Sequence, residues 1–385
     1  MILFTERFCM PTVNLISCGA VNMVGKRCEI LGGRKALVVT DKALQESGIV
    51  KRVTDLIEEA GLQTAVFSDL EANPKDKNVE EGLKMYQEES CNMIVTVGGG
   101  SAHDCGKGIG IVASHPKSIR DYAGLDTLTN SLPPLVCVNT TAGTASEITR
   151  HCVITNTDTN IKFVICDWKN TPQVSINDPE LHVSMPPGLT AATGMDALTH
   201  AVETYVSLAT FPAADACALY AIELISNNLR KAVANGENME ARENMANAQL
   251  LAGMAFNNGG LGYVHAMAHQ LGGMYDMPHG VANAILLPHV ERFNLISNLD
   301  RFARMAQVMG ENIEGLSTRE AAEICIDAMM QLSEDINIPS SISELGIKNP
   351  DFETMAKSAL LDGNAGTNPI KGTEKDIVKI FENIV

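Results

Sequence analysis

Short runs of apolar residues are concentrated in the first half of this chain, and that asymmetry restricts its fold more than any other feature. Six runs have the length of a strand: residues 35–41, 64–69, 93–100, 134–141, 163–168 and 173–178. Helical patterns separate the first three runs. Continuous Val, Ile and Leu residues between helices indicate strands that are buried on both faces, which is typical of a parallel sheet. We therefore predict an α/β domain with a mostly parallel sheet.

The second half of the chain has a different pattern. From about Pro187 onward it consists of long helical segments with almost no indication of strands. One of these segments opens with Ser317 and has Glu320 three residues later, which is the capping-box pair. Two prolines and a glycine interrupt the periodicity at residues 185–189. The prediction is an α/β domain over residues 1–186, followed by an all-helical domain over residues 187–385.

Composition disfavours several classes of protein. The chain has 29 Lys and Arg residues against 46 Asp and Glu residues, a formal charge of −17, so nucleic acid and anionic membranes are not expected partners. The 10 cysteines form no C-x-x-C pair, which favours reduced thiols in a cytoplasmic protein. The apolar start of the chain is too short for a signal peptide. Residues 244–275 lack charged side chains, but they hold too many Asn, Gln and His residues for a transmembrane helix.

Two loops that follow predicted strands could bind a cofactor. The first is a glycine-rich turn before a helix, and it comprises Gly98, Gly99, Gly100 and Ser101. Backbone N–H groups in such a turn, and the helix N-terminus behind it, could face a phosphate. The second loop carries hydroxyl groups that could bind a phosphate, a ribose or a base, those of Thr140, Thr141 and Thr144. A plain tight turn and a helix N-cap are the competing interpretations, and neither loop matches the G-x-G-x-x-G or Walker pattern.

Two charged residues beside predicted strands could serve the same cofactor. Asp41 ends a strand and could accept hydrogen bonds from a ribose 2′-hydroxyl while repelling a 2′-phosphate. It could equally cap the helix that follows. Lys162 precedes a strand and could neutralise a phosphate, although most lysines are simply solvated.

The helical half contains a group of possible metal ligands. Asp196 and His200 are four residues apart and Glu203 follows three residues later, so the three side chains share one helix face. A solvated stripe and half of a metal site both fit this pattern.

Three further histidines are clustered downstream of this segment. His265 and His269 share a helix face, and His279 comes at the expected start of the next helix. One carboxylate and several imidazoles suit Fe(II), Zn(II) or Mn(II). Together with His200, however, four histidines compete for three places, and their spacing does not choose between them.

The chain resembles the iron-dependent (group III) alcohol dehydrogenases over essentially its whole length. The motifs that carry the resemblance are GGGSAHD, NTTAGTASE, TGMDALTHAVE, GLGYVHAMAHQLGG and PHGVANAILLPHV. The resemblance implies a metal-dependent enzyme that uses NAD to interconvert a short alcohol or diol and its aldehyde. The segments LGGRKALVVTDKAL, TRHCVITNT, VSINDP and LLDGNAGTNP favour 1,3-propanediol and 3-hydroxypropanal as the substrate pair.

The resemblance also implies roles for individual residues. The expected ligands of the metal, Fe(II) or alternatively zinc or manganese, are Asp196, His200, His265 and His279. The expected catalytic residues are His269, as a proton relay beside the substrate, and Asp104, near the nicotinamide. The expected NAD contacts are Asp41, Asn73, Gly98, Gly99, Gly100, Ser101, Thr140, Thr141, Thr144 and Lys162. His151 and Phe256 are expected to line the substrate pocket, whereas Glu203 receives no role and is left at the surface or next to a ligand.

Three alternatives remain at this point. A primary alcohol dehydrogenase of broad specificity would use the same residues on other substrates. A lyase similar to dehydroquinate synthase would need several Lys and Arg residues for a phosphorylated substrate, and few lie near the histidines in the sequence. A non-catalytic NAD-binding protein would not need the ligand set. The resemblance further implies a homo-oligomer built from dimers.

Overall fold

The computed structural model describes residues 8–71, 73–159, 161–347 and 351–385 and divides the chain into two compact units. The α/β unit comprises Cys9–Thr141 and Ala145–Val183. The helical unit comprises Ser184–Val385 together with Phe8 and Ala142–Thr144. The main break follows Val183, whereas the sequence predicted it after residue 186. The contribution of the 142–144 segment to the helical unit was not predicted. Close backbone packing explains it, since a Cβ atom at Gly143 would lie 2.7 Å from the carbonyl oxygen of Thr193.

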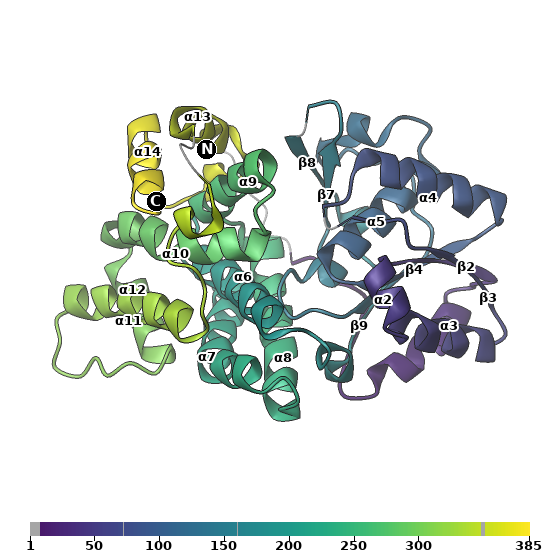
Figure 1. The fold of residues 1–385 in the computed structure, drawn as a ribbon, viewed down its shortest axis with the longest axis horizontal. Coiled ribbons are helices and arrows are strands. Elements are labelled where there is room, and N and C mark those ends of the chain that lie inside the picture. The colour runs from purple at the N-terminus through teal and green to yellow at the C-terminus, as the bar shows by residue number, and fades with distance from the viewer. Residues whose placement is uncertain (1–7, 72, 160, 348–350) are drawn as a thin grey trace. The chain divides into compact units, whose positions relative to one another are not determined.

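A six-stranded sheet forms the core of the α/β unit, and all neighbouring strands in it are parallel (Figure 1). In spatial order the strands are β1 (Val13–Ile16), β9 (Val174–Asn177), β6 (Leu135–Asn139), β4 (Met93–Gly98), β2 (Lys35–Val39) and β3 (Gln63–Phe67). Five of the six predicted runs belong to this sheet. The prediction missed β1, a strand of 4 half-buried residues with no long apolar run.

Helices cover both faces of this sheet. They are α1 (Val24–Ile30), α2 (Lys42–Glu46), α3 (Ile49–Glu59), α4 (Asp76–Glu88) and α5 (Gly100–Ser114). Ala36 and Val38 of β2 pack in one apolar cluster with residues of α1 and α3, whereas Leu37 and Val39 pack in another with residues of α4 and α5. Figure 1 shows α4 and α5 on one side of the sheet and α2 and α3 on the other. The alternation of side chains along each strand therefore buries both faces.

A separate three-stranded sheet corrects one prediction. The apolar run at residues 163–168 was expected in the parallel sheet, but it forms β8 (Ile161–Cys166), which pairs antiparallel with β7 (His151–Asn156) and parallel with β5 (Gly124–Leu125). Only Ile165 of this strand is fully buried. The run was apolar enough to predict a strand, but its partial exposure excludes a central place in a sheet that is covered on both faces.

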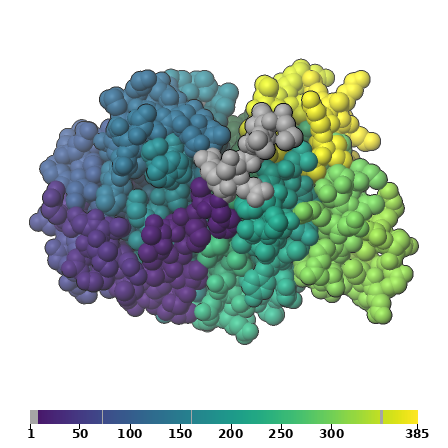
Figure 2. Space-filling view, turned by 180° about the vertical axis from the view of Figure 1, so that it is seen from behind, coloured from purple at the N-terminus to yellow at the C-terminus, as the bar shows by residue number. Residues whose placement is uncertain are grey.

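The described part of the helical unit contains nine α-helices. They are α6 (Pro187–Val206), α7 (Pro212–Ala234), α8 (Met239–Gly259), α9 (Tyr263–Tyr275), α10 (His279–Asn294), α11 (Leu299–Val308), α12 (Thr318–Asp335), α13 (Phe352–Leu361) and α14 (Glu374–Glu382). The predicted capping box of Ser317 and Glu320 begins α12. Figure 2 shows α11 and α12 (light green) and α13 and α14 (yellow) as neighbouring patches on the surface of this unit. No helix in the described ranges is both long and apolar enough to cross a bilayer.

Helix α6 is the centre of the helical unit. It packs against α7, α8 and α10, and its residues from Gly194 to Val206 are all buried. Small residues make this close packing possible. A Cβ atom at Gly194, for example, would lie only 2.3 Å from a methyl group of Leu229 on α7.

Candidate active site

The side chains of Asp196, His200 and Glu203 lie in the buried centre of the helical unit. Their exposed fractions are 2%, 4% and 2%. The interpretation of this helix face as a solvated stripe is therefore wrong. The sequence could not decide the question because α6 is surrounded by other helices, and the packing of those helices depends on residues far along the chain.

Three of the four predicted metal ligands meet at one point. The Oδ1 atom of Asp196 lies 3.8 Å from Nε2 of His265 and 3.7 Å from Nε2 of His279. Candidate ligand atoms of all three residues lie within 4.8 Å of one another. Asp196 comes from α6, His265 from the first turn of α9, and His279 is the first residue of α10. Three helices therefore supply one candidate ligand atom each.

His200, the fourth predicted ligand, lies beside this group. Its ring stacks on that of His265, with 4.6 Å between centroids and 21° between planes. Its other face stacks on Phe256, at 4.2 Å and 18°. Phe256, which was predicted to line the substrate pocket, thus covers the imidazole of a predicted ligand.

Burial determines the charge of these groups. It lowers the pKa of His265 to about 3 and that of His200 to about 4, so both imidazoles are neutral near pH 7. Burial raises the pKa of Asp196, while His200 and a hydrogen bond from Asn283 oppose that rise. Neutral imidazole is the form that binds metal ions.

Asn283 is a site residue that the sequence prediction missed. Its Nδ2 atom lies 2.7 Å from Oδ1 of Asp196, 3.2 Å from Nε2 of His265 and 3.1 Å from Nε2 of His279. Asn283 follows His279 by four residues on α10, so the rule that such residues share a helix face could have identified it.

The donor atoms of this group fit a divalent metal ion. One amide nitrogen, Nδ2 of Asn283, lies within 3.2 Å of all three atoms, so the three atoms face a common point. Ligand bonds of about 2.1 Å place neighbouring ligands of a tetrahedral site roughly 3.4 Å apart. The two separations from Asp196 Oδ1, 3.8 Å and 3.7 Å, need only a small contraction to reach that value. A carboxylate with imidazoles suits Fe(II), Zn(II) or Mn(II).

His269 lies next to this group and has a carboxylate partner. Its ring stacks on that of His279, with 5.6 Å between centroids. Its Nδ1 atom shares a hydrogen bond of 2.7 Å with Oδ2 of Asp362, a residue 93 positions away in the sequence. The sequence prediction missed Asp362 because no local pattern connects it with α9.

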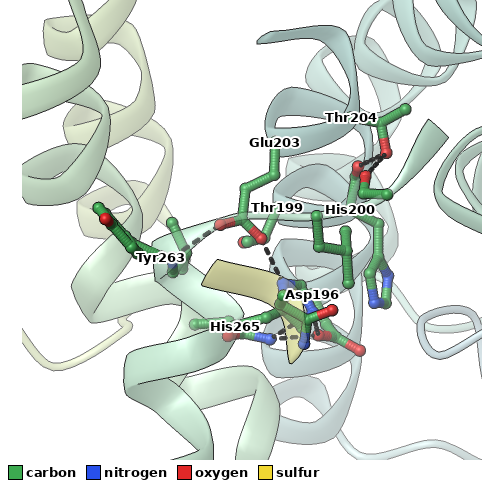
Figure 3. A network of polar contacts seen from close by, with 12 residues as sticks. Asp196, Thr199, His200, Glu203, Thr204, Tyr263 and His265 are labelled. Carbon is green, nitrogen blue, oxygen red and sulfur yellow. Dashed lines mark hydrogen bonds and ion pairs between the residues drawn. The ribbon is translucent and has the colours of Figure 1, made fainter. Parts of the chain in front are cut away.

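Glu203 is buried beside His265 and does not lie at the surface. Its Oε2 atom lies 2.5 Å from Nδ1 of His265, and its Oε1 atom accepts a hydrogen bond of 2.7 Å from the backbone of Val264. Figure 3 shows this carboxylate reaching from α6 to the beginning of α9. Of the two positions that the sequence left open for Glu203, the structure excludes the surface.

In the α/β unit, the glycine-rich turn lies between β4 and α5. Gly98 ends β4, Gly99 is the N-cap of α5, and Gly100 and Ser101 belong to the first turn of that helix. A Cβ atom at Gly99 would lie 2.9 Å from the side chain of Thr141, so a larger residue here would displace that threonine. The turn and Thr141 both lie at the C-terminal ends of parallel strands, where α/β sheets bind their ligands.

Two other predicted cofactor residues, Asp41 and Thr140, follow strands of this sheet, and two more, Lys162 and Asn73, contact each other. The N-cap alternative for Asp41 is observed, since Asp41 caps α2 by accepting a hydrogen bond of 2.9 Å from the backbone of Leu44. Thr140 is buried directly after β6. Lys162 and Asn73 are brought together, because Nζ of the lysine donates to Oδ1 of the asparagine at 2.9 Å.

Asp104 and His151 are connected through the buried Lys107. Asp104 accepts hydrogen bonds from the hydroxyl of Ser146 at 2.7 Å and from the backbone of Val153 at 3.2 Å. Burial raises the pKa of Asp104, and the charge of Lys107 opposes that rise. Lys107 Nζ donates to the carbonyl oxygen of His151, the first residue of β7, at 2.7 Å. Thr144, by contrast, belongs to the helical unit.

Comparison with known proteins identifies the family. A family model described as iron-containing alcohol dehydrogenase matches residues 11–179, and one described as the C-terminal part of the Fe-containing alcohol dehydrogenase family matches residues 190–385. The chain belongs to the iron-containing alcohol dehydrogenases. The predicted family and the predicted fold class are therefore confirmed, and the protein is an oxidoreductase.

Individual members of this family are similar over nearly the full length. The 1,3-propanediol dehydrogenase of Klebsiella pneumoniae is 60% identical over 376 residues, which cover 97% of both chains. The NAD-dependent methanol dehydrogenase of Bacillus methanolicus is 46% identical and covers 98% of this chain and 99% of its own. A solved 1,3-propanediol oxidoreductase has a TM-score of 0.98 and 59% identity, and covers 99% of this chain and 100% of its own.

Proposed function

We propose that this alcohol dehydrogenase uses NAD and a divalent metal, iron first among the candidates, to interconvert 1,3-propanediol and 3-hydroxypropanal. One observation carries the proposal: Asp196, His265 and His279 converge on one point in the buried centre of the helical unit. The 60% identity to the 1,3-propanediol dehydrogenase of Klebsiella pneumoniae supports this substrate pair over other short alcohols.

The proposed metal ligands are Asp196, His200, His265 and His279. A metal held there would act as a Lewis acid on the hydroxyl or carbonyl oxygen of the substrate. One carboxylate and three neutral imidazoles would leave a divalent ion with one net positive charge. Phe256 stacks on His200 and would restrict the movement of that ring.

The proposed cofactor site lies at the C-terminal edge of the parallel sheet. The Gly98–Ser101 turn and the first N–H groups of α5 would face the pyrophosphate of NAD. The carboxylate of Asp41 would favour the free 2′-hydroxyl of NAD over the 2′-phosphate of NADP. Further contacts would come from Asn73, Thr140, Thr141, Thr144 and Lys162, with Asp104 supporting the nicotinamide and His151 lining the pocket. NAD itself would supply the hydride chemistry.

His269 would move the hydroxyl proton of the substrate. The hydrogen bond between its Nδ1 atom and Asp362 holds one proton on that side of the ring. The opposite nitrogen, Nε2, would then accept the hydroxyl proton during oxidation and return it during reduction. Asp362 would stabilise the imidazolium that forms. We further propose, on the family resemblance, a cytoplasmic homo-oligomer built from dimers.

The test is an assay of NADH formation with anaerobically purified protein whose metal content is measured in the same preparation. We expect iron bound to each chain, and a higher kcat/KM for 1,3-propanediol than for methanol, ethanol, 1-butanol and 1,2-propanediol. NAD should support faster turnover than NADP. His265→Ala should remove the metal and the activity together. Absence of turnover with every short alcohol in metal-replete protein would refute the proposal, and wild-type metal content in His265→Ala would refute the ligand assignment.

A further inference from the structure

Glu203 joins α6 to the first turn of α9. Its Oε1 atom accepts a hydrogen bond of 2.7 Å from the backbone of Val264, and its Oε2 atom lies 2.5 Å from Nδ1 of His265. Both side chains are almost completely buried, so water does not compete for this contact. The carboxylate of Glu203 thus contacts both the backbone at the start of α9 and His265, the predicted metal ligand on that helix (Figure 3).

The start of α9 is built around this carboxylate. Its N-cap residue is Gly262, which has no side chain to cap the helix. Glu203 and Asn368 supply the missing acceptors from elsewhere in the chain, and Oδ1 of Asn368 accepts from the backbone of Tyr263 at 3.1 Å. A Cβ atom at residue 262 would lie 3.0 Å from Oε1 of Glu203 and 2.7 Å from Oδ1 of Asn368. Glycine at this position therefore lets both acceptors reach the helix N-terminus.

The same contact bears on which nitrogen of His265 is free. Burial raises the pKa of Glu203 to about 8. Once ionised, its carboxylate can only accept a hydrogen bond, so the ring proton of His265 lies on Nδ1 and Nε2 keeps its lone pair. That Nε2 atom is the one that lies 3.8 Å from Oδ1 of Asp196. In known metal sites, a carboxylate on the far side of a ligand histidine fixes the orientation of the ring and increases its basicity.

We propose that Glu203 is a positioning residue for the metal site, which holds His265 in the tautomer and orientation that binds the ion. The inference rests on the proposed metal-dependent function. It extends that function, because it assigns a role to a residue outside the ligand set and explains why a carboxylate is buried there.

The decisive variant is Glu203→Gln, which keeps the shape of the side chain. A glutamine has one acceptor oxygen where the carboxylate has two. If that oxygen accepts from Val264, the amide NH₂ group faces Nδ1 of His265. His265 must then accept at Nδ1 and carry its proton on Nε2, so that it has no lone pair for the metal. Loss of such a partner typically weakens metal binding about tenfold to a hundredfold.

Glu291→Gln is the matched control. Glu291 is a fully buried carboxylate on α10, and it accepts a hydrogen bond of 3.3 Å from Nδ2 of Asn294. Asn294 in turn donates to Asn368 at 3.1 Å, so this control changes the polar network at the start of α9 without replacing the partner of His265. A second test variant, Gly262→Ala, displaces the carboxylate of Glu203 and leaves its chemistry intact.

The experiment is a titration of the metal-free full-length proteins with Co²⁺ in competition with a chelator, together with their thermal unfolding. We expect Kd to rise about tenfold to a hundredfold for Glu203→Gln, to rise less for Gly262→Ala, and to stay unchanged for Glu291→Gln. A purely structural role would lower the unfolding temperature and leave Kd unchanged. Wild-type Kd values in both test variants would overturn the inference alone. Failure of the wild type to bind Co²⁺ would overturn the metal-dependent function and this inference with it.

Discussion

Replacing Gly280 by alanine tests whether the packing of α10 on α6 determines the geometry of the metal site. Gly280 follows His279 directly, and a Cβ atom at this position would lie 2.3 Å from the carbonyl oxygen of Ala192 on α6. Carbon and oxygen atoms at ordinary contact are roughly 3.3 Å apart or more. The two backbones must therefore separate locally by about 1 Å. Because Ala192 precedes Asp196 by one turn, the separation increases the Asp196–His279 distance, which is 3.7 Å at present.

The expected effect is a loss of both stability and metal. Overpacking costs about 1–3 kcal/mol, and the upper end applies here because a backbone carbonyl cannot rotate away. For a unit of this size, about 3 kcal/mol lowers the unfolding temperature by roughly 6–12 °C. At a separation of about 4.7 Å, two ligand atoms are too far apart to share an ion with bonds of about 2.1 Å.

The assay compares bound metal per chain and thermal unfolding in the wild type, Gly280→Ala and the control Gly188→Ala. Gly188 lies in the first turn of α6, and a Cβ atom there would meet nothing within 4 Å. The control should keep its metal and its unfolding temperature, or gain a few tenths of a kcal/mol from reduced chain entropy. Wild-type metal content and stability in Gly280→Ala would refute the reasoning.

Three further predictions concern pH, a buried cation and proton transfer. Burial lowers the pKa of His103 to about 3. Below pH 6.5 this histidine therefore takes up a proton in the unfolded chain but not in the folded chain. The free energy of unfolding should be at its full value above pH 6.5 and about 2 kcal/mol lower at pH 5. His103→Gln should remove that part of the loss when urea unfolding is compared at the two pH values. Arg242→Leu should cost about 2–4 kcal/mol in thermal unfolding because two buried acceptors, on Thr190 and Met185, and one half-buried acceptor lose their donor. Removal of the exposed Arg292 should cost less than about 1 kcal/mol. Asp362→Asn should lower kcat about tenfold or more with unchanged metal content, because His269 loses the carboxylate that orients it, and an unchanged kcat would contradict that role.

Local patterns in the sequence predicted the secondary structure well. Strand and helix periodicities depend on residues that are close in the sequence, so they can be recognised without the fold. Five of the six predicted strands belong to the parallel sheet. The sixth run, at β8, shows the limit of such patterns. Its apolar residues predict a strand, but they do not show which sheet it joins. It pairs with β7, the strand that directly precedes it in the chain, and with the more distant β5.

The candidate active site was likewise predictable in part from the sequence and in part only from the tertiary structure. By itself, the sequence determined the chemistry available: a carboxylate and imidazoles at helical spacing, a glycine-rich turn after a strand, and acidic residues whose partners were unknown. Only the tertiary structure decided that Asp196, His265 and His279 converge, that Glu203 faces His265, and that Asp362 faces His269. These contacts join residues 62 to 93 positions apart, and no local pattern predicts them. The contacts of Asp196 and Glu203 exist because α6, α9 and α10 pack closely around small residues. The contact of Asp362, at the end of α13, exists because α13 packs on α9.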